Sequence, residues 1–393
     1  MKYFILPFLF VSTLCADIIE ELNSNLPEIL NKTPSIKGDF LKVEPFPDQG
    51  GSFINDVYLI TTDCGEELAL KVENKNWTDR KTINEVISIN HVARLTTIPV
   101  PHVLRYVNDL QASSIRQEYI LMKRIKGQPL NHAINEIYQD KKRYFKVLNQ
   151  LADVMAQLNS IQFDSMGSFS MKEGCSIGAS IEFPEYIASK PSENFAQHAV
   201  CWLTYYCDEM KRLVKTNHPN QKVFAYFIPK FEHMLESNDF DLLNEDNDKF
   251  VYCHQDFVMK NILIDEDKIT AILDWEWSGP ALLEFEYKTG FDFLFSQEDR
   301  DYFSALMKQR GLEHYFQPPP KNRQLYYQLI GHLYTLISCY EWIDGKLEHS
   351  AKFLDQKLEQ RMVKSSPDID MSSFVRSKAH ALDQLIIKFN NIN

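Results

Sequence analysis

The sequence lacks several features that define other classes of protein. After its N-terminus it has no apolar stretch of about 18 residues or more, so no membrane-spanning helix is expected. It has 42 basic residues against 54 acidic ones, and a formal net charge of −12 would repel a polyanion. Nucleic acid is therefore not an expected partner. Internal repeats and low-complexity tracts are also missing, whereas a hydrophobic content of 44% is enough for two compact lobes.

The seven cysteines show no spacing typical of a zinc or redox site. Cys201 and Cys207 lie six positions apart in a helical pattern, so they are expected to face different sides and not to pair. Cys253 falls within an apolar, strand-like segment, which indicates a small buried side chain.

Residues 1–16 form a pattern typical of a secretory signal peptide, with an apolar run from Phe4 to Leu14 and small residues ending at Ala16. The alternative is an apolar N-terminal helix that packs on the fold. The first interpretation predicts a protein of the secretory pathway or a secreted protein, and the second predicts a cytoplasmic one.

Residues 17–126 are expected to form an N-terminal lobe. A helical pattern lies within residues 17–37, and a second helix carries a stripe from Ile83 to Ala93. Strand-like segments that suit an antiparallel sheet lie at Phe40–Phe46, Val57–Thr62, Leu68–Glu73, Val103–Val107 and residues 118–125. Residues 127–393 are then expected to form a mostly helical lobe, which makes the fold class α+β.

Polar residues with a recognisable spacing follow the strand-like pattern near residue 251. His254, Asp256 and Asn261 match the spacing H-x-D-x-x-x-x-N of a kinase catalytic loop, and Asp274 follows the apolar strand Ile269–Leu273. Phosphoryl transfer needs groups that hold magnesium on the phosphates and position the acceptor hydroxyl. We therefore assign Asp256 as the catalytic base and Asn261 and Asp274 as magnesium ligands. His254 is expected to brace the loop.

Lys71 lies in the strand-like sequence ELALKVE. Strand alternation puts it on the face opposite Leu68, Leu70 and Val72, so it can reach a cleft while the aliphatic face packs. It is assigned to the phosphates, with Glu85 on the next helix as its partner. The alternatives are a solvated lysine, as expected for Lys75 and Lys81, and a plain surface glutamate.

The glycine pair at Gly50 and Gly51, followed by Ser52, would let backbone amides approach phosphates closely, although an ordinary turn explains it about as well. On this basis Gly51 and Ser52 are candidate nucleotide-binding residues.

The segments HQDFVMKNILID and ILDWEWS resemble the catalytic loop and metal motif of the aminoglycoside phosphotransferase and choline kinase superfamily. The resemblance implies a two-lobed protein-kinase-like fold with an antiparallel sheet in the N-terminal lobe, and ATP and Mg²⁺ as cofactors. It implies the same roles for Asp256, Asn261, Asp274, Lys71 and Glu85. The segment LMKRIKG is similar to the family hinge, which implies that backbone groups of Lys123 and Ile125 hold the adenine.

Two departures from protein kinases bear on the substrates. The loop DQGGSFIND lacks the full glycine pattern, so the choice between ATP and GTP stays open, and no activation-loop ending follows Asp274. The acceptor is therefore expected to be a hydroxyl of a small molecule, with amine-bearing compounds as one class.

Glu276, Glu284 and Glu286 either line a pocket for a positively charged acceptor or lie on solvated faces. The alternative function is a kinase-like binding module that has lost turnover.

Overall fold

The computed structural model describes residues 19, 22–46, 55–73, 81–170, 176–181, 187–216, 221–237, 239–288, 291–312, 317–338, 340–343, 346–349 and 371–391. The predicted signal peptide at residues 1–16 and the candidate residues Gly51 and Ser52 lie outside these ranges and stay predictions.

The chain divides into two compact units. Unit 1 comprises the described parts of residues 1–182 and 249–316, and unit 2 those of residues 183–248 and 317–393. The predicted sheet and the predicted catalytic segment both belong to unit 1. A boundary between lobes at residue 126 stays a prediction.

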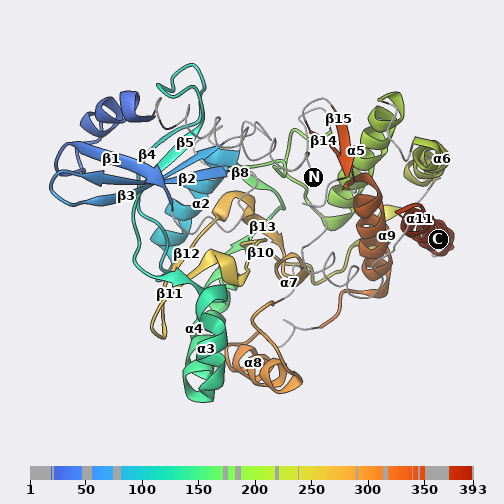
Figure 1. Ribbon diagram of the computed structural model, residues 1–393. Coiled ribbons are helices and arrows are strands. Elements are labelled where there is room, and N and C mark those ends of the chain that lie inside the picture. Colours follow the sequence, from blue (N-terminus) through green and yellow to red (C-terminus); the bar gives the residue numbers. More distant parts are fainter. Residues whose placement is uncertain are drawn as a thin grey trace, which may run out of the picture. The chain divides into compact units, whose positions relative to one another are not determined.

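Unit 1 begins with a five-stranded antiparallel sheet in the order β1-β2-β3-β5-β4 (Figure 1). The strands are β1 (Phe40–Pro45), β2 (Asn55–Thr62), β3 (Glu67–Glu73), β4 (Val103–Val107) and β5 (Tyr119–Lys123). All five strands overlap the segments predicted from the sequence.

The two faces of this sheet are covered by different helices. Residues 22–31 form a helix that packs on the face carrying Leu68, Leu70 and Val72, all fully buried. Helix α2 (Lys81–Leu95) contacts the other face, where its Val86 packs on Ile120 of β5. Because Lys71 pairs with Ile120 across the strands, the lysine lies on the side of α2.

The rest of unit 1 is built from helices and short antiparallel sheets (Figure 1). The helices are α3 (Leu130–Gln139), α4 (Lys141–Asn159), α7 (Glu284–Lys288) and α8 (Gln297–Gln309), with short 3₁₀ turns η2 (Met259–Asn261) and η3 (Trp275–Trp277). One sheet has the order β12-β11-β6 and another β13-β10-β7, while β8 and β9 form a hairpin. Their bounds are β6 (Gln128–Pro129), β7 (Gln162–Phe163), β8 (Ser168–Ser170), β9 (Ser176–Gly178), β10 (Phe250–Cys253), β11 (Ile262–Asp265), β12 (Lys268–Ile272) and β13 (Gly279–Leu282).

Helix α4 forms the centre of the apolar core in this region. Asp140 caps its N-terminus, since the carboxylate accepts hydrogen bonds from the amides of Lys142 and Arg143. The predicted apolar stripe of α4 includes Val147 and Leu151, which are fully buried in a cluster with residues of β11 and β12. The core thus fixes the hairpin β11–β12, which Asn261 directly precedes and Asp274 closely follows and which we call the catalytic hairpin.

Unit 2 is mainly helical. Its elements are α5 (Phe195–Lys215), α6 (Gln221–Ser237), η1 (Phe240–Leu243), α9 (Lys321–Ser338), α11 (Met371–Asn390) and the hairpin β14 (Tyr340–Ile343) with β15 (Lys346–His349). Asn194 caps α5, whose apolar residues pack along one face. Cys201 and Cys207 of α5 are both free thiols, as predicted.

A sheet region and a helical region together confirm the predicted α+β class. Within the described part of the chain, the helices are too short or too polar for any of them to span a bilayer.

Candidate active site

The loop between β10 and β11 carries the first group of candidate residues. Gln255 adopts a left-handed backbone conformation with φ of 65°, which is uncommon for a residue with a side chain. Asp256 follows it, and the amide of Asn261 donates to the Asp256 carboxylate at 2.8 Å and to its backbone oxygen at 2.9 Å. Lys260 lies 3.3 Å from the same carboxylate. The structure therefore brings Asp256 and Asn261 together.

His254 connects this loop to the strand that precedes Asp274. Its Nδ1 accepts from the amide of Asp256 (3.2 Å), so Nε2 carries the proton and donates to the carbonyl of Leu273 (2.9 Å). Burial lowers the pKa of His254, which favours the neutral ring. The contacts are those of the brace that the sequence predicted.

Pairing between β11 and β12 places Asp274 beside Asn261. The amide of Leu273 donates to the carbonyl of Asn261 at 2.8 Å. Asp274 then adopts a left-handed conformation with φ of 65°, and Trp275 is fully buried directly after it. The chain thus changes direction at the strained residue Asp274, and the buried tryptophan anchors the segment that follows.

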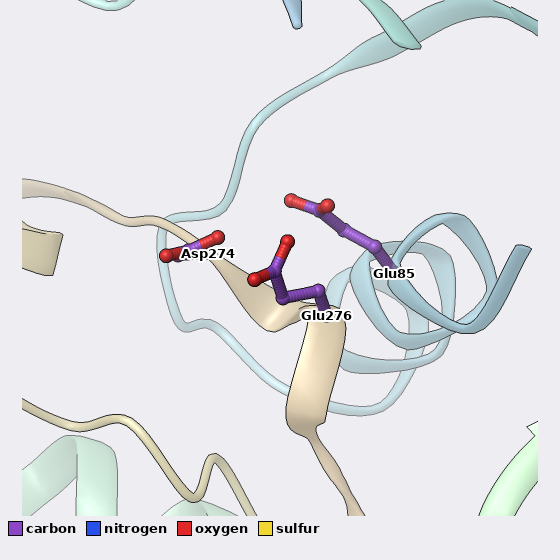
Figure 2. A group of neighbouring side chains, drawn as sticks. All are labelled: Glu85, Asp274 and Glu276. Carbon is purple, nitrogen blue, oxygen red and sulfur yellow. The ribbon is translucent and has the colours of Figure 1, made fainter. Parts of the chain in front are cut away.

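Lys71 lies at the centre of a cluster of carboxylates. Its Nζ is 2.6 Å from Glu85 Oε2, 2.8 Å from Asp274 Oδ1 and 3.0 Å from Glu276 Oε2. Figure 2 shows the three carboxylates pointing toward one another from α2, from the end of β12 and from η3. The lysine side chain is 11% exposed. Strand β3, helix α2 and the catalytic hairpin therefore meet at this cluster.

The protonation states of the cluster follow from burial and from its charges. Burial raises the pKa of Glu85 to about 7, the Lys71 ammonium opposes the change, and the carboxylates of Glu276 and Asp274 add to it. Burial also acts to raise the pKa of Asp274, but the ion pair with Lys71 outweighs burial and holds this pKa at about 2. Burial opposes the charge of Lys71 as well, yet the surrounding carboxylates raise its pKa well above the usual value. Lys71 and Asp274 are accordingly both charged at neutral pH.

Two residues of the cluster were not predicted from the sequence. Lys81 was expected to point to solvent, and this was wrong: its side chain is 2% exposed and its Nζ lies 2.9 Å from Glu276 Oε2. Glu276 is 5% exposed and also accepts from Asn55 at 2.8 Å. The position of Glu276 between two tryptophans was a signal that could have found it, because such an apolar setting does not suit a solvated glutamate. The sequence around Lys81 holds no comparable signal.

Asn84 fastens α2 to two other elements. Its amide donates to the carbonyls of Glu276 (2.9 Å) and Ser278 (3.0 Å), and its side-chain oxygen accepts from the amide of Phe169 in β8 (2.7 Å). Asn84 is fully buried. Since Glu85 is its neighbour on α2, these bonds fix where that carboxylate lies.

Glu286 of α7 lies beneath the catalytic loop. Its Oε2 accepts from the backbone amides of His254 (2.5 Å) and Gln255 (3.3 Å), and burial raises its pKa to about 7 against the effect of these two donors. Glu276 and Glu286 are therefore both buried and bonded within the protein. Neither glutamate lies on a solvated face, and each contacts other groups inside the protein.

The candidate hinge follows β5. The amide of Lys123 donates to the carbonyl of His102 (3.1 Å), so a nucleotide contact at this residue would fall on its carbonyl oxygen. Ile125 lies between β5 and β6. Gly127 has φ of +134°, and a Cβ there would lie 2.7 Å from Thr270 Oγ1, so only glycine fits this approach to β12. The adenine-binding role of Lys123 and Ile125 stays a prediction.

The donor groups near Asp274 suit magnesium. The side-chain nitrogen of Asn261 donates to Asp256, so the side-chain oxygen of Asn261 is left to coordinate a metal. Asp274 uses its Oδ1 for the ion pair with Lys71. Magnesium prefers carboxylate and carbonyl oxygens, and it is usually held by one or two carboxylates together with substrate phosphates. These residues therefore fit the metal that the resemblance implies.

Comparisons with known proteins define the class. The chain belongs to the phosphotransferase enzyme family (APH), whose profile matches residues 47–317. A search of curated protein sequences finds no match.

Solved structures show the same fold. They include the streptomycin–ATP–APH(2")-IIa ternary complex, with a TM-score of 0.52 and 13% identity over 82% of this chain and 92% of that one. ADP-bound aminoglycoside phosphotransferase APH(2'')-Ib has a TM-score of 0.51 and 12% identity over 90% and 97%. The gentamicin complex of APH(2")-IIa has a TM-score of 0.51 and 12% identity over 91% and 97%. The two-lobed protein-kinase-like fold predicted from the sequence is thereby confirmed.

Proposed function

We propose that this phosphotransferase is a magnesium-dependent small-molecule kinase that transfers the γ-phosphate of ATP to a hydroxyl group. One observation carries the proposal. Lys71 forms ion pairs with Glu85 and Asp274, and the hydrogen-bonded pair Asp256–Asn261 lies next to them. Phosphoryl transfer requires a cation on the phosphates, a metal site and a base within one small volume. Membership of the phosphotransferase family supports the same reaction class.

The residues divide the reaction among them. Asp256 accepts the proton of the acceptor hydroxyl while the hydroxyl oxygen bonds to the γ-phosphorus and the bond to the β–γ bridging oxygen breaks, which releases ADP. The amide of Asn261 keeps the Asp256 carboxylate in one orientation. Lys71 binds the phosphates, and Glu85 orients its ammonium. Asn261 and Asp274 would hold magnesium, which when bound offsets the charge on the phosphates.

The acceptor is proposed to be a small molecule, with amine-bearing compounds as the first class to test. A net charge of −12 attracts cations, and the similar structures were solved with streptomycin and gentamicin. GTP is the donor to compare with ATP.

The test is turnover with magnesium and ATP or GTP over a panel of amino alcohols, aminoglycosides and amino sugars, with ADP release as the readout. Asp256→Asn is expected to lower the rate with an active acceptor by about 10²–10⁴-fold and to leave nucleotide binding intact, because only the proton acceptor is lost. Asp265→Asn, which changes an exposed carboxylate at the end of β11, is the matched control and should keep the rate.

Calorimetry of nucleotide binding separates the proposal from its alternative. Binding of ATP without turnover of any acceptor would favour the inert binding module. A protein that binds neither nucleotide, or an Asp256→Asn variant as active as the wild type, would contradict the kinase assignment.

A further inference from the structure

Helix α2 begins with a buried ammonium group. Lys81 Nζ lies 2.9 Å from Glu276 Oε2 and 5.8 Å from the centroid of the Trp277 ring. Within the described ranges no hydrogen bond of normal geometry accompanies this ion pair. A cavity lined by Lys71 and Lys81 has room for about one water molecule. The charge of Lys81 is therefore offset by protein groups and not by bulk solvent.

The stability of α2 does not account for this lysine. Burial of an ammonium group is unfavourable, and an apolar side chain of similar volume would fill such a place at lower cost. The positive charge must act on something else nearby.

The nearest candidate is Lys71, because the two lysines share one oxygen atom. Glu276 Oε2 receives Lys81 at 2.9 Å, Lys71 at 3.0 Å and the amide of Asn55 at 2.8 Å. Without Lys81, the charge of Glu276 would act on Lys71 alone. Lys71 would then be held more strongly on the side of η3.

A lysine has three N–H donors, and those of Lys71 are directed to Glu85, Asp274 and Glu276. To contact a phosphate, Lys71 must give up one of these partners. The contact with Glu276 is the longest of the three, and Glu276 is the carboxylate that has a second cation. Release of Glu276 therefore leaves no buried carboxylate without a cation.

We propose that Lys81 is a positioning residue: it neutralises Glu276 so that Lys71 can turn from Glu276 to the phosphates of the nucleotide. The inference rests on the proposed function, in which Lys71 binds the phosphates. It assigns to the first residue of α2 a part in nucleotide affinity without any contact with the nucleotide.

The test is the affinity of Lys81→Met for ATP and for adenosine, measured by calorimetry with magnesium. ATP is expected to bind about tenfold more weakly than to the wild type, whereas adenosine, which has no phosphate, should bind equally well. Lys42→Met, an exposed lysine of β1 that pairs with Glu44, is the matched control and should leave both affinities unchanged. A variant that lost ATP and adenosine affinity equally would indicate a structural role and overturn the inference.

Glu276→Gln provides the second arm. This change removes the charge that would hold Lys71, so in its background Lys81→Met is expected to alter ATP affinity by less than about threefold. A full tenfold loss in that background would contradict the mechanism. Lys81→Gln takes the place of Lys81→Met in both backgrounds where the methionine variant does not fold.

The outcomes for the inference and for the proposed function differ. If the wild type binds ATP and Lys81→Met binds it equally well, the inference fails and the kinase assignment stands. If the wild type binds no nucleotide, the kinase assignment fails and the inference with it.

Discussion

Glu286 is an acidic side chain that the fold buries against the catalytic loop. Its pKa of about 7 lies above the ordinary value of 4.5. Between pH 4.5 and about 7, Glu286 is protonated in the folded protein and ionised in the unfolded chain. The contribution of Glu286 to stability is therefore fully present below pH 4.5 and is lost as the pH rises through about 7. Stability is expected to fall with rising pH in that window, by up to about 1.4 kcal/mol per pH unit from this group.

Glu286→Gln should make this dependence weaker. The glutamine stays neutral and can still accept from the amides of His254 and Gln255 with its oxygen. Urea unfolding across the window measures the slope of stability against pH. Glu298→Gln, an exposed side chain of α8, should keep the wild-type slope. A Glu286→Gln variant with that same slope would show that Glu286 does not titrate there. Because burial also raises the pKa of Glu85, part of the slope is expected to remain.

Motif spacing was enough to single out Asp256, Asn261 and Asp274, since their chemistry depends on short separations along the chain. In the structure Asn261 bonds to Asp256 and to the residue before Asp274, and the roles of the three stay proposals. Lys81 and Glu276 could not be found in this way. A buried lysine and a solvated one look alike in a sequence, and only folding shows that the partner lies far along the chain.

Asn84 of helix α2 bonds to η3 and to β8 through one buried side chain. Asn84→Ala removes three hydrogen bonds and leaves buried backbone groups of Glu276, Ser278 and Phe169 without partners. Unfolding free energy is expected to fall by about 3 kcal/mol. The turnover rate should fall as well, because Glu85 is no longer fixed beside Lys71.

The measurements are denaturant unfolding and steady-state ADP release. Asn90→Ala changes an exposed asparagine of the same helix and is the matched control. Equal stability of the two variants would show that the Asn84 bonds do not hold the helix.

The strands and helices of unit 1 were largely predictable, because alternation in β3 and the three-to-four residue repeat in α4 are local patterns. The pairing of β10 with β13 and β7 was not. Strands β10 and β13 are short and buried on both sides, so no alternation marks which face or which neighbour they have, and β7 has only two residues.

The candidate nucleotide and metal residues in the described ranges all belong to unit 1. Binding of magnesium and ATP is therefore expected to stabilise unit 1, since a ligand protects the part of a protein that binds it. Hydrogen exchange with and without ATP should show slower exchange in β3, α2 and the hairpin β11–β12. The amides of α5 and α6 serve as the internal reference, and equal slowing there would contradict the expectation.

The division into units was not predictable from sequence order. Unit 2 gathers helices from residues 195–237 with others from residues 321–390, and the catalytic hairpin lies between these segments in the chain. A chain that leaves one unit and returns to it carries no single boundary that its composition could mark.

The ion cluster has a consequence for how the protein is made. Lys71 contacts carboxylates that lie 203 and 205 positions later in the sequence. A nascent chain that has left the ribosome only as far as Cys253 contains both lysines and Glu85 but neither later carboxylate. Closing the sheet on α2 at that stage would bury Lys71 and Lys81 without the later carboxylates that they contact, at a cost of several kcal/mol. The amino-terminal half is thus expected to fold only after synthesis has passed Glu276, which makes completion of the active site a late event in biogenesis.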